Sequence, residues 1–276
     1  MNKSIKLLDC TLRDGGYYNN WDFNPDLVTD YLDAMAALKV DFVELGLRSL
    51  KNVGFKGQCA FSTDTFIDNL KIPIELMDKI CVMVNGSEFI LEKKDPSDFE
   101  DQKFFQVSVL EKLFKRKSQS RVSLVRIACH IHEFEACLPV STWLHEQGYL
   151  VGFNLMQIAD RTKEEIKTLA RKANFFPIDI LYFADSMGGL NPKEVNEIVT
   201  AFKKGWKGEL GIHTHDNMGQ AISNSLQAVS DGVTWADSTV TGMGRGAGNA
   251  QTEYLIMALE KYRKNTGNPT KLISEC

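Results

Sequence analysis

The stretch GIHTHDN, from Gly211 to Asn217, ends an apolar run with two histidines separated by one residue. Side chains alternate between the two faces of an extended strand, so His213 and His215 are expected to point the same way. Two imidazoles on one face can share a metal ion, or they can simply be hydrogen-bonded at the strand end. A metal site needs further ligands, and the fold must bring them from other segments.

Seven other segments repeat the same pattern of a short apolar run followed by polar residues and a helical pattern. They are IKLLDC, VDFVELG, KICVMVN, SLVRIAC, YLVGFNL, IDILYFAD and VTWADS. Helix starts lie between them, such as the capping box of Thr162 and Glu165 and the pair Asn191-Pro192. Eight strands alternating with helices predict an α/β protein, a (β/α)8 TIM barrel in which residues 1–276 form one catalytic domain. An open doubly wound sheet would show the same alternation.

The positions of the polar residues favour the closed barrel. Nearly every predicted strand ends in a polar cluster: Arg13 with Asp14, Glu44, Asn85, His130 with His132, Asn154, Asp185, His213 with His215, and Asp237. A barrel brings the carboxyl ends of its strands to one face, where barrel enzymes keep their active sites. The sequence therefore predicts an active site built from many segments.

Composition narrows the classes of function. With 43% hydrophobic and 25% charged residues and a net charge of -4, the chain has the balance of a soluble protein without a basic surface for nucleic acid. Its six cysteines form no CxxC pair, which favours reduced thiols in a cytoplasm. The N-terminus has too short an apolar core for a signal peptide, and no apolar run is long enough to cross a bilayer. We expect a cytoplasmic protein without a membrane or nucleic acid partner.

Asp14 is the natural third ligand for the histidine pair. One carboxylate with two imidazoles leaves positions open for substrate and water, as in a catalytic metal site. Arg13 beside it needs a partner, which Glu44 of the second strand can supply. The guanidinium could stabilise an enolate, or Arg13 and Glu44 could be a structural pair that closes the barrel top.

Two further motifs can contribute to this site. GMGRGAGN, from Gly242 to Asn249, fits GxGxxG/A, but too little chain follows for the second strand of a dinucleotide-binding unit. A tight loop that lets Asn249 reach the metal is the better interpretation. His130 and His132 form a second pair expected to share a strand face, where they could hydrogen-bond substrate or move protons; a structural role is the alternative for His132.

The motifs TLRDG, VELG, ADSMG, HTHDN and GMGRGAGNAQTE occur in this order from Asp9 to about Glu253. Together they resemble the DRE-TIM metallolyase superfamily, the group of hydroxymethylglutaryl-CoA lyase, and are most similar to the 4-hydroxy-2-oxovalerate aldolases. The resemblance implies a (β/α)8 barrel with a divalent metal, Mg or Mn, with Zn or Co as alternatives. The ligands that it implies are Asp14, His213, His215 and, from the lyase branch, Asn249.

The resemblance also implies the reaction, which is cleavage of a 4-hydroxy-2-oxo acid to pyruvate and an aldehyde, or its reverse. Arg13 and Glu44 would support the pyruvate enolate, and we expect Asn154, Asp185 and His132 to bind substrate. A Claisen-type acyltransferase similar to isopropylmalate or homocitrate synthase is the alternative, although those enzymes read RDGEQ where this chain has RDGGY. A non-catalytic barrel that keeps the metal site is a further alternative.

The chain departs from the aldolases at two places. Their catalytic histidine, three residues after the metal-binding aspartate, is replaced here by Tyr17, so Tyr17, His130, His132 or a metal-bound water is the candidate for proton transfer. The aldolases also carry a C-terminal helical region that docks a dehydrogenase, and this chain stops before it. We therefore expect a 2-oxo acid and an aldehyde as partners but no dehydrogenase, and a homodimer is left open.

Overall fold

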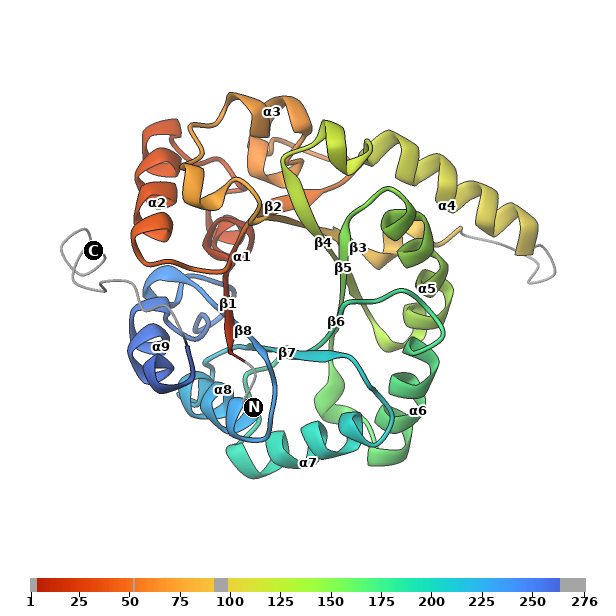
Figure 1. The fold of residues 1–276 in the computed structure, drawn as a ribbon, viewed down its shortest axis with the longest axis vertical. Coiled ribbons are helices and arrows are strands. Elements are labelled where there is room, and N and C mark those ends of the chain that lie inside the picture. Colours follow the sequence, from red (N-terminus) through yellow and green to blue (C-terminus); the bar gives the residue numbers. More distant parts are fainter. Residues whose placement is uncertain (1–3, 52, 92–98, 264–276) are drawn as a thin grey trace.

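Residues 4–51, 53–91 and 99–263 are described by the computed structural model, and within them eight parallel strands close into a barrel in the order β1 to β8 (Figure 1). Each strand pairs with its neighbour in the sequence, and β1 closes the barrel on β8 with Leu7 opposite Ala236. Helices surround the strands (Figure 1), as βα units with right-handed crossovers require. The predicted TIM barrel is confirmed, and the open doubly wound sheet is excluded.

All eight strands lie in the apolar runs expected from the sequence. They are β1 (Lys6–Asp9), β2 (Phe42–Arg48), β3 (Ile80–Asn85), β4 (Val122–Cys129), β5 (Leu150–Leu155), β6 (Ile180–Asp185), β7 (Glu209–Thr214) and β8 (Trp235–Ser238).

The described helices follow the strands and differ widely in length. They are α1 (Thr11–Gly15), α2 (Pro25–Ala37), α3 (Asp64–Asn69), α4 (Phe99–Leu113), α5 (Ile131–Glu146), α6 (Lys163–Ala173), α7 (Pro192–Lys203), α8 (Ala221–Ser230) and α9 (Thr252–Ala258).

The helix starts behave as their capping residues predict. Asn24 accepts a hydrogen bond from the amide of Asp26 ahead of α2, and the capping box of Thr162 and Glu165 opens α6. The sequence after the eighth strand predicts a last helix from Gln251 to Asn265, but α9 ends at Ala258 and one 3-10 turn follows it. The end of that prediction lies outside the described residues.

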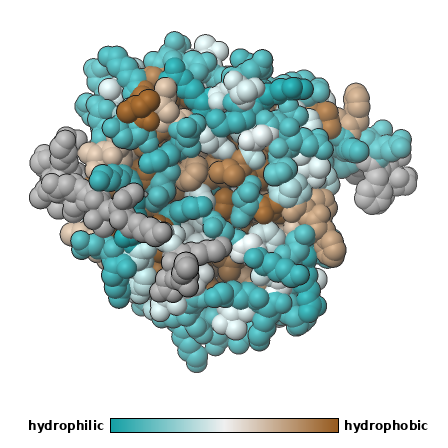
Figure 2. All heavy atoms as spheres, viewed as in Figure 1, coloured by the Kyte–Doolittle hydropathy of each residue, from teal (hydrophilic) through white to brown (hydrophobic). Residues whose placement is uncertain are grey.

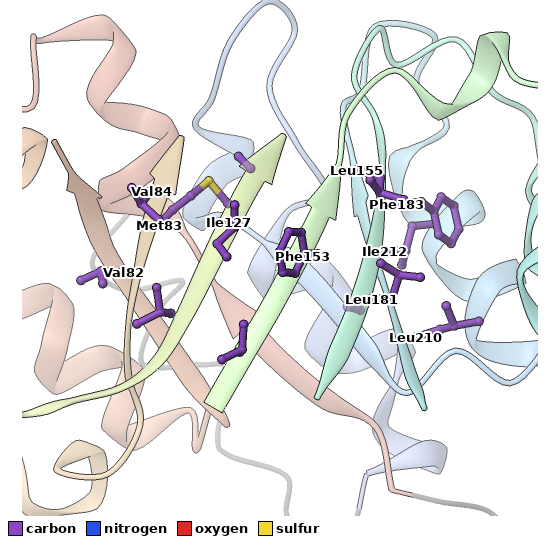
Figure 3. Packing of buried hydrophobic residues seen from close by; sticks show 14 of the residues in the cluster. Val82, Met83, Val84, Ile127, Phe153, Leu155, Leu181, Phe183, Leu210 and Ile212 are labelled. Carbon is purple, nitrogen blue, oxygen red and sulfur yellow. The ribbon is translucent and has the colours of Figure 1, made fainter. Parts of the chain in front are cut away.

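The hydrophobic core has two parts, a large one between the strands and the surrounding helices and a small one inside the barrel. Figure 3 shows Phe183, Leu210 and Ile212 on the β6 and β7 strands, and Phe183 stacks on Phe202 of α7 at 5.6 Å between ring centroids. Burying one such ring stabilises the fold by roughly 2 to 3 kcal/mol. Inside the barrel the ring of Tyr182 needs a glycine on the next strand, because a Cβ at Gly211 would lie 2.3 Å from it.

On the face shown in Figure 2, hydrophilic residues predominate around the rim, and many of the hydrophobic residues lie near the centre. None of the helices in the described ranges is both long and apolar enough to cross a membrane. The five described cysteines are buried free thiols, as expected, and Cys276 lies outside the described residues.

Candidate metal centre

The carboxyl ends of β1 and β7 bring three side chains together. Asp14 lies on α1, directly after β1, whereas His213 ends the inward-facing positions of β7 and His215 follows that strand. One ligand atom from each of the three lies within 4.8 Å of the other two, and all three side chains are buried. The three residues thus fit a divalent cation, which needs compact N and O donors.

Asn249 supplies a fourth donor from the loop after β8. Its amide nitrogen donates to the Asp14 carboxylate and, at 3.2 Å, to the carbonyl of Met243. Its amide oxygen is buried without a partner among the described residues, so this oxygen is available to bind a metal ion. The loop can approach this closely only with a glycine at Gly244, where a Cβ would lie 2.7 Å from Asp14 Oδ2.

A second group of potential ligands, Cys10, His213 and Asp237, shares one histidine with the first. It is the poorer metal site, because the Cys10 thiol donates to the Ser238 carbonyl at 3.4 Å and burial raises the pKa of this thiol well above its usual value. A thiol must lose its proton to bind a metal. The Asp14 group is therefore the candidate centre.

Arg13 links the candidate centre to the second strand. Its Nη1 donates to Asp14 Oδ1 at 2.6 Å and its Nε to Glu44 Oε2 at 2.8 Å. Its Nη2 is buried and has no hydrogen-bond partner within the described part of the chain. A buried guanidinium nitrogen of this kind is a donor available to a bound substrate.

Arg126 of β4 continues this network to the other side of the barrel. It donates to both oxygens of Glu44, at 2.8 and 2.7 Å, and to Asp237 Oδ2 at 2.7 Å. The same oxygen of Asp237 lies 3.0 Å from Nδ1 of His213. We call the six side chains that are linked in this way the charged ring: Asp14, Arg13, Glu44, Arg126, Asp237 and His213.

The charged ring lowers the pKa of two of its buried carboxylates, Asp14 and Glu44. Burial raises the pKa of Asp14, but Arg13 and the neighbouring histidines outweigh it and lower the value to about 2. At Glu44 burial is likewise outweighed, by Arg126 and Arg13, and the pKa is about 2. The pKa of His215 falls from 6.5 to about 4, mainly through burial and secondly through His213. A neutral imidazole beside an ionised carboxylate is the state that binds a metal.

The candidate centre lies in a pocket of about 450 Å³, open solvent included, whose two sides differ in chemistry. The polar side is formed by residues after β1 and on or after β7 and β8: Arg13, Asp14, Tyr17, His213, His215 and Arg245. The apolar side comes from β2 to β6 and the residue after β5: Leu47, Met83, Ala128, Met156 and Ala184. Asn85, Asn154 and Ser186 add polar atoms beside that apolar wall.

Of the other residues predicted for the site, Tyr17 and Asn154 line the pocket and Asp185 does not. Tyr17 lines the pocket and is half exposed, and Asn154 lines it with a buried amide oxygen that no described residue binds. Asp185 is absent from the lining. Its carboxylate accepts hydrogen bonds from the amides of Gly189 and Leu190, at 3.1 Å each, and so it holds the loop after β6.

The expected shared strand face of His130 and His132 is wrong. The β4 strand ends at Cys129, and the chain turns at His130 into α5, where the Glu133 side chain accepts a hydrogen bond from the His130 amide at 2.9 Å. The two rings stack 5.5 Å apart, and neither lines the pocket. A helix start directly after the strand is the physical reason, because it ends the alternation on which the expectation rested.

Two residues of the site were not anticipated from the sequence, Arg126 and Arg245. Arg126 interrupts the apolar run SLVRIAC, and a charge inside a buried strand needs partners. That interruption was the available signal. Arg245 lies within the glycine-rich motif, which drew attention to backbone geometry instead of to this side chain.

The fold and the site define a (β/α)8 barrel with a candidate divalent-metal centre at the carboxyl ends of its strands. Residues 4–275 match the HMGL-like family model, and the chain belongs to this family. The resemblance noted in the sequence is thereby confirmed.

Curated relatives cover most of the chain at low identity. The chain is 27% identical over 273 residues to 4-hydroxy-2-oxovalerate aldolase 2 of Rhodococcus jostii (strain RHA1), covering 97% of this chain and 72% of the relative. It is 29% identical over 259 residues to the 4-hydroxy-2-oxovalerate aldolase of Pelotomaculum thermopropionicum, covering 93% and 70%.

Solved structures show the same architecture. The N-terminal domain of a candidate aldolase from Bacteroides vulgatus matches with a TM-score of 0.79 at 29% identity, over 98% of this chain and 85% of that chain. The HMG-CoA lyase of Brucella melitensis matches with a TM-score of 0.75 over 99% and 96%. Because the Brucella melitensis lyase is only 14% identical to this chain, its likeness concerns the fold alone.

Proposed function

We propose that the protein is a divalent-metal-dependent carbon–carbon lyase that cleaves a 4-hydroxy-2-oxo acid to pyruvate and an aldehyde, or joins them. The observation that carries the proposal is the unpartnered Nη2 of Arg13 beside the group Asp14, His213 and His215. The names of the aldolase relatives support the same class of reaction. A Mg or Mn ion held by these residues and Asn249 would supply Lewis-acid polarisation of the 2-oxo acid.

Arg13 is suited to stabilise the enolate oxygen that becomes negative during cleavage. Two of its nitrogens are bound to Asp14 and Glu44, so its free Nη2 is held in place before substrate arrives. A preorganised donor stabilises developing charge more than a mobile one does, because no reorganisation is needed during the reaction. Glu44 acts through Arg13 and is a positioning residue.

Tyr17 is the proposed proton-transfer group. Of the three side chains considered for this role, it alone lines the pocket in the described structure, whereas His130 and His132 lie outside the lining. In cleavage its hydroxyl takes the proton of the substrate C4 hydroxyl while passing its own proton to solvent on the exposed side of the ring. The C3–C4 bond breaks, its electron pair forms the enolate of pyruvate, and the C4–O group leaves as the aldehyde carbonyl. Asn154, which lines the same pocket, would accept a hydrogen bond from substrate through its amide oxygen, which no described residue binds.

The test is exchange of the methyl protons of pyruvate in D2O, followed by NMR with Mn- or Mg-loaded protein. We expect exchange that stops when the metal is chelated and that the Arg13→Lys variant largely loses. His132→Ala serves as the control, because its ring lies outside the pocket. Absence of exchange in the loaded wild-type protein would refute the proposal, and thiol release from acetyl-CoA with a 2-oxo acid would indicate the acyltransferase instead.

A further inference from the structure

Arg245 is a cation at the pocket that the proposed reaction does not use. It lines the pocket together with Asp14 and His215, and its side chain is exposed. Within the described structure no hydrogen bond or ion pair is found for its guanidinium, which lies over the ring of Tyr17 at 5.5 Å from the centroid. Its charge is therefore not neutralised by any described carboxylate.

The loop that carries Arg245 is held on two sides. The Tyr18 hydroxyl donates to the carbonyl of Gly246 at 3.1 Å, and the amide of Asp216, after β7, donates to the carbonyl of Gly248 at 2.8 Å. Tyr17 in turn packs edge-on against Trp21 at 4.7 Å. The guanidinium is thus kept at the pocket mouth by contacts to its loop and to the ring beneath it.

With a divalent cation bound, the net positive charge at the pocket would exceed the single negative charge of a 2-oxo acid. The charged ring holds three carboxylates and two guanidiniums, a formal charge of −1 with histidine neutral. A divalent cation makes this +1, and Arg245 makes it +2. A 2-oxo acid brings only one negative charge through its carboxylate. One positive charge then remains, and it lies at Arg245.

We infer that Arg245 binds a second anionic group of the substrate, a carboxylate or a phosphate at the end of the chain away from the 2-oxo acid. This inference rests on the proposed function, and it defines the aldehyde product as an anionic one. Arg is suited to this role because its planar fork donates two parallel hydrogen bonds to either group. A short neutral aldehyde would leave the guanidinium without a partner.

The experiment measures binding of matched ligands to Mn-loaded protein by calorimetry. One pair is 2-oxoglutarate and 2-oxopentanoate, which have equal chain lengths and differ in the second carboxylate. The other pair is 2-oxo-3-deoxy-6-phosphogluconate and 2-oxo-3-deoxygluconate, which differ in a terminal phosphate. We expect at least one pair to show a preference of about tenfold or more for the member with the second anionic group, the size expected for a hydrogen-bonded charge. The pair that shows it identifies the anionic group.

Two variants separate a local contact from general attraction. In Arg245→Gln the ratio of the two dissociation constants should fall close to one. Lys56→Gln is the matched control, because Lys56 also lies over an aromatic ring, that of Trp21 at 5.7 Å, but does not line the pocket. This variant should keep the wild-type ratio.

Each remaining outcome has a distinct meaning. Equal binding within both pairs, or a preference that survives in Arg245→Gln, overturns the inference but leaves the proposed function standing. A preference lost equally in Lys56→Gln also overturns it, since general attraction then explains the result. If none of the four ligands binds the loaded protein, the proposed function itself fails.

Discussion

His213 Nδ1 lies 3.0 Å from Asp237 Oδ2, the oxygen that also accepts a hydrogen bond from Arg126. A carboxylate oxygen accepts hydrogen bonds, so Nδ1 is the natural donor in this contact. The other nitrogen, Nε2, lies 3.8 Å from Asp14 Oδ2, on the side of the candidate metal. Asp237 thus sets both the orientation of the ring and the position of its proton, as carboxylates behind metal-binding histidines do.

Replacing Asp237 by Asn should therefore weaken Mn binding by about 10- to 100-fold although Asp237 is not a ligand. The measurement is the dissociation constant from metal titration of apo-protein. Asp64→Asn is the matched control, because it removes a carboxylate from another buried arginine, Arg48, far from any histidine contact. Equal metal affinity in Asp237→Asn and the wild type would contradict the orienting role.

His213→Ala should abolish tightly bound divalent metal, because only one imidazole and one carboxylate of the three-residue group remain. Metal content after dialysis, measured by mass spectrometry, checks this. His132→Ala removes a histidine from the other HxH pair and should retain the metal. A His213→Ala protein with full metal content would refute the ligand assignment.

Arg13→Lys should remove most lyase activity, by about 100-fold or more, and leave the metal bound. The charge remains, but a lysine cannot bind Asp14 and Glu44 and still present a third nitrogen to the substrate. Turnover and metal content are measured on the same preparation. Near-normal turnover would show that the free Nη2 does not serve the enolate.

Tyr17→Phe should lower cleavage of the 4-hydroxy-2-oxo acid substrate by about 100-fold or more, as loss of a proton-transfer group does. The substituted ring can still pack on Trp21 and beneath Arg245, so the pocket keeps its shape. Tyr18→Phe, which loses only a hydroxyl bound to Gly246, is the control and should lose far less activity. Equal rates for Tyr17→Phe and the wild type would assign the proton transfer to water.

The metal-free protein should lose stability as the pH falls from 7 to 5. Burial holds the pKa of folded His215 near 4, below the ordinary value of 6.5, so the unfolded chain takes up the proton first. Stability is full above pH 6.5 and falls toward pH 4, with a loss of about 2 kcal/mol between pH 7 and 5 from this group. Asp14 and Glu44, with pKa values of about 2, act in the same direction but at lower pH.

Urea unfolding with a chelator at pH 7 and pH 5 measures this loss. The His215→Asn variant should lose less stability over the same interval, because it has no proton to gain at this position. His145→Asn, on the exposed side of α5, should lose as much as the wild type. A loss that does not shrink in His215→Asn would show that another group titrates.

Much of the fold follows from local patterns in the sequence. Each strand is an apolar run with a polar end, and caps at Asn24, Thr162 and Asn191 mark helix starts, so the count of eight and the closed barrel could be predicted. Asp14 could be placed near His213 for the same reason, since both follow or end strands whose carboxyl ends meet on one face.

The facing of individual side chains was harder to predict. Asp185 ends β6 just as polar residues end other strands. The inward residues of β6 are Tyr182 and Ala184, however, so the alternation of side chains turns Asp185 away from the pocket. Apart from the pair Arg13 and Glu44, the links of the charged ring to Arg126 could not be predicted from the sequence. Arg126 binds Glu44, 82 positions away, and Asp237, 111 positions away, and no local pattern records such pairings.

The division of the pocket into a polar and an apolar side has a practical consequence for protein engineering. The residues proposed to make or break bonds come from the first, seventh and eighth βα units, whereas the apolar wall comes from the second to the sixth. Libraries that vary only Leu47, Met83 and Met156 would therefore reshape the apolar side of the pocket without changing the reacting groups or Arg245. The shape of this pocket and the bond chemistry can evolve on separate segments of the barrel.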